Sequence, residues 1–409
     1  MALRSSVRLV GSVAAALAVI APLPGAATAM SPVSQAAALS SWMPRTAEPM
    51  PRELVVILRQ SSYDFFRAVN REWARRVCDA FQGDRDALTA VRLQGDAHIE
   101  QYAVTDSAYG LDDFDDTAEG PAVIDLVRFI GSLDLAARDR GWPDRTDQMV
   151  SELLRGYRQG LENPGFMPRT PSLVARLRRK PVRDRAAFLA WAEGLMIQVP
   201  SSIARQAREA LALLAEHAAK ERPDLPAAYF RVKKIGGFRL GIGSRRVPKL
   251  LVRVEGPSSR EADDLILEAK QPADLSGVSC LSLAAESPAV RIISGTRQIG
   301  RLHHQVLSLV PKMTRGDDSM RHWWIHDWMP SYQEVDIETL ASASDLAELA
   351  RDAGAQLGTA SLPVGSSAAH DARRRQSETI GRLDRRIRDV ARQLTNDMLA
   401  AWEAFKRKE

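Results

Sequence analysis

The hydrophobic pattern changes character twice along the chain, and this constrains the fold more than any other feature. From Leu54 to about residue 227, apolar residues recur at helical spacing. Residues 228–335 instead show short alternating runs and glycines, which are typical of antiparallel strands. Helical spacing then returns. The pattern predicts an α+β fold with a helical lobe over 51–227, a small β-rich lobe over 228–335, and C-terminal helices over 336–409 that complete the helical lobe.

The composition fits a globular protein with a large core. The 409 residues are 45% hydrophobic and 26% charged, and this length allows two domains or one domain of two lobes. Much of the net charge of +5 comes from arginine-rich helical stretches at 173–186 and 371–392. We interpret these stretches as solvated helix faces, and we therefore predict no nucleic-acid partner.

The first residues have the form of a secretory signal peptide. Arg4 and Arg8 precede an apolar run, and Ala27-Thr28-Ala29 provides a small-residue cleavage site. The apolar run is too short for an ordinary membrane span. We predict a signal peptide over 1–29 cleaved after Ala29, a linker over 30–50, and a periplasmic or secreted protein with no membrane span after signal removal. A retained N-terminal anchor is the alternative.

The chain has two cysteines, Cys78 and Cys280. In an oxidising compartment they could form one disulfide, but their wide separation suits two buried thiols equally well. Both interpretations stay open at the level of the sequence.

Carboxylates are concentrated in residues 94–101 and 111–116, the second of which reads Leu-Asp-Asp-Phe-Asp-Asp. The alternating residues between them predict a hairpin that would bring Asp96 beside Asp113. Carboxylates this dense need a cation, a basic partner or open water. A hard metal ion such as Mg²⁺ and an acidic surface turn with helix caps explain the cluster about equally well.

Four motifs resemble those of the bacterial proteins grouped as domain of unknown function 2252. That family is similar to aminoglycoside phosphotransferases and, more distantly, to protein kinases, so the resemblance implies a protein-kinase-like fold of two lobes. It covers most of the chain and is most specific at 94–126. The motifs are Gly95-Asp96-Ala97-His98-Ile99-Glu100-Gln101, Asp112-Asp113-Phe114-Asp115-Asp116, Gly120-Pro121 and Ile124-Asp125-Leu126.

The resemblance implies a role for each acidic segment. One aspartate would orient or deprotonate an acceptor hydroxyl, a second group would hold Mg²⁺, and a helix aspartate would tie down the catalytic loop. Gln101 replaces an expected asparagine and carries its amide one methylene further out. The implied catalytic residues are Asp96 and His98, the latter as support for the loop; the implied metal ligands are Gln101, Asp113 and Asp115; the helix aspartate is Asp125.

The β-rich part would hold a phosphate donor. The resemblance implies a glycine-rich turn, followed by a strand and then a strand that ends in a lysine, with ATP or another nucleotide as the donor. Phe238 and Arg239 stand where a smaller pair is expected, and Ser294 stands where a glutamate partner of the lysine is expected. The implied donor-binding residues are Gly236, Gly237, Gly241 and Lys270.

The order of these parts is reversed relative to kinases, because Asp96 precedes Lys270, and the resemblance therefore implies a circularly permuted arrangement. Three functions stay open. The first is a phosphotransferase-like enzyme with an unknown small-molecule or protein acceptor, although ATP is scarce outside the cytoplasm. The second is a kinase-like module that has lost phosphoryl transfer and binds a metabolite or protein. The third is a metal-assisted hydrolase that uses Asp96, His98, Asp113 and Asp115.

Two further features each have two interpretations. Arg67 would either approach the phosphate site or form an ion pair with the acidic cluster. His322, Trp324 and His326 fall on one face of a predicted strand, where they would either pack in the core or form a wall for a flat ligand.

Overall fold

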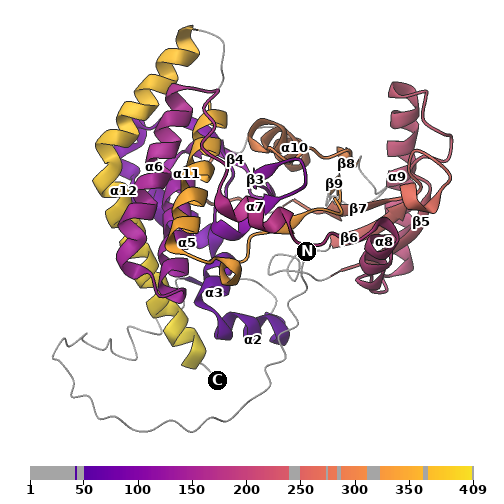
Figure 1. Cartoon of the computed structure of the whole chain (residues 1–409), viewed down its shortest axis with the longest axis horizontal. Coiled ribbons are helices and arrows are strands. Elements are labelled where there is room, and N and C mark those ends of the chain that lie inside the picture. The colour runs from indigo at the N-terminus through magenta and orange to yellow at the C-terminus, as the bar shows by residue number, and fades with distance from the viewer. Residues whose placement is uncertain are drawn as a thin grey trace.

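The protein has an α+β fold in which helices gather on one side and a five-stranded antiparallel sheet extends from the other (Figure 1). Among the described helices, none combines the length and apolar character that a membrane crossing requires. The predicted signal peptide, most of the linker, Arg239, Gly241 and His322 lie outside the described residues. The computed structural model describes residues 42–43, 50–238, 249–272, 275–282, 287–310, 323–362 and 367–407.

The helical region combines segments from both ends of the chain. α5, α6, α11 and α12 lie side by side (Figure 1), and their apolar faces form the largest core of the protein. The helical spacing of apolar residues near the C-terminus is confirmed, since Ile380, Ile387 and Met398 are buried along one helix. The helices are α2 (Arg52–Gln60), α3 (Ser62–Ala68), α4 (Asn70–Ala80), α5 (Val123–Asp139), α6 (Thr146–Glu162), α7 (Ser172–Arg178), α11 (Ala343–Ala360) and α12 (Ser367–Arg407).

Glycines let α6 and α11 approach until their backbones touch. A Cβ atom on Gly354 would lie 2.1 Å from the Leu153 carbonyl oxygen, and one on Gly358 would lie 2.0 Å from the Tyr157 carbonyl oxygen. Gly156 of α6 has the same relation to α11. This helix pair is therefore specified by the absence of side chains at its contact line.

Two small sheets position the acidic segments. β1 (Ala90–Leu93) pairs with β4 (Ala118–Pro121), and β2 (Tyr102–Val104) pairs with β3 (Tyr109–Leu111). The predicted hairpin is thus confirmed as β2–β3. β10 (Gln333–Glu334) adds to the free edge of β2. Short 3-10 helices complete the description at Gln82–Ala87, Ile99–Gln101, Pro143–Arg145, Glu261–Asp263 and Ile337–Thr339.

The large sheet has the strand order β5-β6-β7-β9-β8. The alternating segments predicted as strands are confirmed as β6 and β7, and Lys270 at the end of β7 pairs with Lys249 on one side and Trp324 on the other. Helices α8 (Arg185–Gly194), α9 (Ser201–Glu221) and α10 (Pro288–Ile299) cover the sheet. The strands are β5 (Val232–Gly237), β6 (Lys249–Val254), β7 (Leu265–Lys270), β8 (Leu307–Val310) and β9 (Trp323–Asp327).

The structure differs from the sequence-based expectation in three places. The apolar residues at 292, 299, 302, 306 and 309 have helical spacing and predict one continuous helix. Instead, α10 ends at Ile299, and the backbone N–H of Val306 donates to Asp327 before β8 begins. The helices α8 and α9 precede residue 228, yet they pack on the sheet rather than on the helical core. β10 falls before residue 335, yet it pairs with β2 instead of the large sheet.

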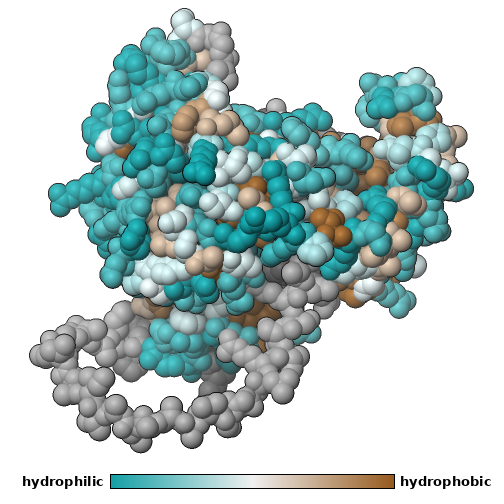
Figure 2. All heavy atoms as spheres, in the orientation of Figure 1, coloured by the Kyte–Doolittle hydropathy of each residue, from teal (hydrophilic) through white to brown (hydrophobic). Residues whose placement is uncertain are grey.

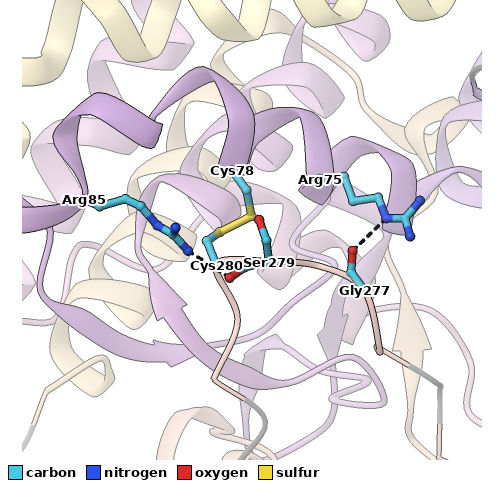
Figure 3. Close-up of a disulfide and its surroundings, with 6 residues drawn as sticks. All are labelled: Arg75, Cys78, Arg85, Gly277, Ser279 and Cys280. Carbon is cyan, nitrogen blue, oxygen red and sulfur yellow. Dashed lines mark hydrogen bonds between the residues drawn. A yellow bond between two sulfur atoms is a disulfide. The ribbon is translucent and has the colours of Figure 1, made fainter.

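A disulfide between Cys78 and Cys280 links α4 to the segment that follows β7 (Figure 3). Arginines of the helical region hold the same segment by its carbonyl groups. Arg75 donates to Gly277 at 2.9 Å and Arg85 donates to Ser279 at 2.8 Å (Figure 3). The segment 277–280 is therefore fastened both covalently and by hydrogen bonds to α4 and the 3-10 helix that follows it.

Candidate functional site

The loop that carries Asp96 is fastened to helix α5 through Asp125. The Asp125 carboxylate accepts hydrogen bonds from the backbone N–H groups of Gln94 at 2.7 Å and Gly95 at 2.9 Å. Gly95 has a φ of +92°, and a Cβ atom there would lie 1.9 Å from the Asp116 carbonyl oxygen, so only glycine fits. The expected tie between Asp125 and this loop is therefore present.

Asp96 itself forms a buried ion pair with Arg128, one helical turn beyond Asp125. The Arg128 Nε and Nη2 atoms lie 2.9 Å and 2.8 Å from Asp96 Oδ1. The guanidinium also lies 3.6 Å from the centre of the Phe66 ring. Burial raises the pKa of Asp96 to about 6, although Arg128 opposes the shift. The carboxylate is thus poised to exchange a proton near neutral pH.

His98 lies behind this carboxylate as a neutral ring. It is buried, its Nε2 atom is 3.7 Å from Asp96 Oδ2, and neither ring nitrogen has a hydrogen-bond partner within the described parts of the chain. Burial, reinforced by Arg67 and Arg128, holds its pKa well below the usual range. Arg67 forms an ion pair with Glu100 at 2.9 Å, which agrees with the second of its two predicted uses.

The side chain of Gln94 joins the two acidic segments. Its amide oxygen accepts the backbone N–H of Asp96 at 2.8 Å, and its amide nitrogen donates to the backbone oxygens of Asp112 at 3.0 Å and Asp113 at 2.7 Å. Next to it, the Gln101 carbonyl accepts the backbone N–H of Asp112 at 2.8 Å. These contacts fix the separation between Asp96 and Asp113.

Asp113 occupies a conformation that aspartate seldom adopts, with a φ of 55°. Its carboxylate lies 3.3 Å from Lys270 Nζ, and that of Asp115 lies 3.6 Å from the same atom. Although burial opposes the change, Lys270 and Lys249 lower the pKa of Asp113 to about 2. Burial and the proximity of Asp113 raise the pKa of Asp115 to about 7. The turn thus holds one firmly ionised carboxylate and one that titrates near neutrality.

Lys270 is buried among groups from its own sheet as well as from the acidic turn. Glu268, two residues earlier on the same face of β7, lies 3.4 Å from Lys270 and 3.4 Å from Lys249. The Lys270 ammonium lies 5.1 Å from the centre of the Trp324 ring, and that ring stacks on His326. Glu268 therefore supplies the acidic partner that was expected on α10, where Ser294 stands instead.

His304 bridges the helical region and the sheet beside this site. Its Nε2 atom lies 3.9 Å from Asp112 Oδ1, and its Nδ1 atom lies 3.5 Å from Asp327 Oδ1. Although burial opposes the change, these two carboxylates raise the pKa of His304 to about 9. The imidazolium form therefore joins the two parts of the protein at neutral pH.

The glycines of β5 are engaged in packing. A Cβ atom on Gly236 would lie 2.5 Å from the Met196 Cβ atom. Gly237 exchanges two backbone hydrogen bonds with Ile197, of 2.9 Å and 2.7 Å, so its own N–H is already committed. Contact of Gly236 and Gly237 with a phosphate donor stays a prediction, and the turn with Gly241 lies outside the described residues.

The oxygen donors of the acidic turn fit a hard cation. Asp113 and Asp115 both face the Lys270 ammonium, so their carboxylates can share one positive charge. In the described ranges, no three His, Cys, Asp or Glu side chains converge as a ready metal cage. Two carboxylates completed by phosphate oxygens are nevertheless an ordinary Mg²⁺ environment. The donor set suits a metal that arrives with a phosphorylated ligand.

Four residues of the site escaped the sequence-based prediction: Gln94, Arg128, Glu268 and His304. Two of them carried a readable signal. Arg128 lies three residues after Asp125 on the same helix, and Glu268 lies two residues before Lys270 on the same strand face. The roles of the other two depend on which segments meet in space.

One family model matches nearly all of the chain beyond the N-terminal segment. It is described as an uncharacterised protein conserved in bacteria, DUF2252, and it matches residues 56–171 and 175–408. No curated protein and no solved structure matches the chain.

Proposed function

This chain belongs to the DUF2252 family of uncharacterised proteins conserved in bacteria. On the basis of the kinase-like roles that its motifs imply, we propose that it is an exported, kinase-like phosphotransferase. Its acceptor is a small molecule or protein of unknown identity, and its donor is a nucleotide bound with Mg²⁺. The proposed fold is a circularly permuted kinase-like fold, with the large sheet as the donor lobe and the helical region as the acceptor lobe.

One contact carries the proposal. Lys270 of β7 lies 3.3 Å from Asp113, although 157 residues separate them in the chain. Phosphoryl transfer needs a cation that pairs with donor phosphates next to a carboxylate that holds metal. The meeting of these two residues supports such a site, and the chain order supports the permuted arrangement.

The side chains suggest how the work would be divided. Arg128 engages Oδ1 of Asp96, so the remaining oxygen, Oδ2, would accept the proton of the acceptor hydroxyl. Lys270 would pair with donor phosphate oxygens. Asp113 and Asp115, with Gln101 beside them, would hold Mg²⁺, which when bound would neutralise charge on the phosphates. His98 would support the Asp96 loop by packing.

The disulfide favours an oxidising location. Disulfides persist mainly in secreted, periplasmic or surface proteins, and Cys78 and Cys280 are paired. Together with the form of the first 29 residues, this supports export. A nucleotide donor is scarce there, so the donor concentration would limit the reaction.

A catalytically inactive binding module is the second candidate. It is favoured by the two ion pairs that Lys270 makes with Asp113 and Asp115, which a donor would have to displace. The replacements at Gln101 and Ser294 also favour it. The hydrolase alternative is weaker, because among the described residues no three His, Cys, Asp or Glu side chains converge to hold a metal by themselves.

Thermal unfolding with and without ATP and Mg²⁺ tests the proposal. We expect ATP with Mg²⁺ to raise the Tm of the purified protein, since a ligand at 100 times its Kd adds about 2.7 kcal/mol of stability. Asp113→Asn should abolish the shift, whereas Asp144→Asn, which changes an exposed aspartate, should retain it.

Two outcomes are informative beyond this. Absence of any shift in the wild-type protein would contradict the nucleotide-binding proposal. A shift without transfer or hydrolysis of the terminal phosphate over hours would select the inactive binding module.

A further inference from the structure

Helix α10 is pressed directly against the acidic turn. A Cβ atom on Gly295 would lie 2.3 Å from Thr117 Oγ1, so α10 touches the residue that follows Asp116. Thr117 is itself fixed, because its hydroxyl donates to the Leu93 carbonyl at 2.6 Å. Gly300 closes the other end of the contact, with its Cβ position 3.2 Å from the Phe114 ring.

Arg291 lies one turn before Gly295 on this helix and is 95% buried. Its Nη1 atom is shielded from solvent and has no hydrogen-bond partner in the described parts of the chain. Within those parts it also forms no ion pair, although Asp115 and Asp116 are close enough to act on its charge. The neighbouring Arg92 is already paired with Glu119 at 3.0 Å.

A buried guanidinium without a partner is costly, because the lost hydration is not replaced. Burial accordingly lowers the pKa of Arg291, despite the opposing attraction of Asp116 and Asp115. Arginine is also the side chain best suited to bind phosphate, since its planar fork donates two parallel hydrogen bonds. A buried, unpaired arginine beside the proposed metal-binding turn therefore suggests an anionic ligand.

We propose that Arg291 and Lys270 together form a binding site for phosphoryl oxygens beside the acidic turn. The site takes a di- or triphosphate group that arrives with a divalent cation. This inference rests on the proposed function. It assigns a ligand-binding role to Arg291 of α10, the helix on which the resemblance led us to expect a glutamate.

Binding of inorganic pyrophosphate with Mg²⁺, measured by calorimetry on the full-length protein, tests the inference. We expect Arg291→Met to weaken binding about tenfold or more, because one charge-assisted pair is lost. The affinity of Arg291→Lys should fall between those of the wild-type protein and Arg291→Met. Arg297→Met, which removes an exposed arginine from the same helix, should bind as the wild-type protein does.

The Tm without ligand provides a second test. A ligand-binding role predicts that Arg291→Met does not lower this Tm, whereas a structural role predicts that it does. Arg291→Met keeps the apolar stem and removes an unpaired buried charge, so its Tm without ligand should equal or exceed that of the wild type. Unchanged affinity in Arg291→Met, a lower Tm without ligand, or failure of this variant to fold would each overturn the inference.

The two proposals fail in different ways. Pyrophosphate binding that depends on Arg291, without any binding of ATP, would refute the nucleotide donor and retain the anion site. Equal binding of ATP with Mg²⁺ by the wild type and Arg291→Met would retain the donor and refute the role of Arg291. If the wild-type protein binds neither pyrophosphate nor ATP, both are refuted.

Discussion

His304 shows how a single side chain can couple the helical region to the sheet. It faces Asp112 at the end of β3 and Asp327 in β9, and the His326 ring lies 5.0 Å away. Its charge is therefore held between two acids that belong to different parts of the protein. A change in that charge alters the contact between those parts.

The raised pKa of His304 predicts a pH dependence of stability. A cationic group whose pKa rises from 6.5 to about 9 on folding stabilises the protein fully below pH 6.5, and this contribution is lost as the pH rises through about 9. We expect the unfolding free energy of His304→Gln, measured by urea denaturation, to fall less between pH 6.5 and about pH 9 than that of the wild type. His303→Gln, at the adjacent exposed position, should keep the wild-type slope. Equal slopes in both variants would contradict the assignment.

At the scale of single residues, the motif resemblance grouped several residues into one site, and the functions that it implies for them stay predictions. Asp96, Asp113 and Lys270 were predicted to meet, and Lys270 does lie against Asp113. Gln94 and His304 were missed because a glutamine or histidine has no typical role until its neighbours are known. Arg291 was also missed, because its meaning comes from burial without a partner, which sequence spacing cannot report.

At the scale of elements, the contact between α6 and α11 leaves no room for added side-chain volume. Gly354→Ala would place a methyl group against the Leu153 backbone oxygen, which lies 2.1 Å from the Cβ position and cannot move independently. We expect a loss of about 1–3 kcal/mol in unfolding free energy from this overpacking.

The control is the same substitution where space is free. A Cβ atom on Gly194, at the end of α8, meets nothing within 4 Å, so Gly194→Ala should leave stability unchanged or raise it by up to about 1 kcal/mol. Chemical denaturation of both variants measures the difference. A tolerated Gly354→Ala would show that the two helices can separate without cost.

Elements were predictable where one periodicity dominated. β6 and β7 are short apolar runs that are buried along most of their length, and α12 keeps a helical stripe along its length. The prediction of one helix over 292–309 was wrong, because the apolar residues beyond Ile299 also fit helical spacing. In the structure, part of this segment forms β8 and pairs with β9. Short apolar runs do not separate these outcomes, since tertiary pairing decides between them.

For the whole molecule, the disulfide is the largest single constraint on the unfolded chain. It joins residues 202 positions apart, and the chain-entropy model assigns about 5 kcal/mol to a loop of this length. We expect the double variant Cys78→Ala and Cys280→Ala to unfold at a lower urea concentration than the wild type. A reducing agent should destabilise the wild-type protein and leave the double variant unaffected.

The cross-link should also affect ligand binding, because the segment that follows Lys270 is held to α4 by the disulfide and by Arg75 (Figure 3). A double variant with wild-type stability would show that the hydrogen bonds alone suffice.

The surface in Figure 2 is mostly hydrophilic, with hydrophobic residues scattered over the sheet side. The division into two regions followed from sequence, but the assignment of α8 and α9 to the sheet did not, because a helical pattern does not say what the helix will cover.

The long last helix, α12, contacts α2, α3, α4, α5 and α6. The ribosome therefore makes the first helices long before it makes the surface on which they rest. At 5–20 residues per second, translation from Asp139 to Arg407 takes roughly a quarter of a minute to a minute. Throughout that interval the early helices lack their α12 partner, so the apolar faces that α12 covers stay open to chaperones.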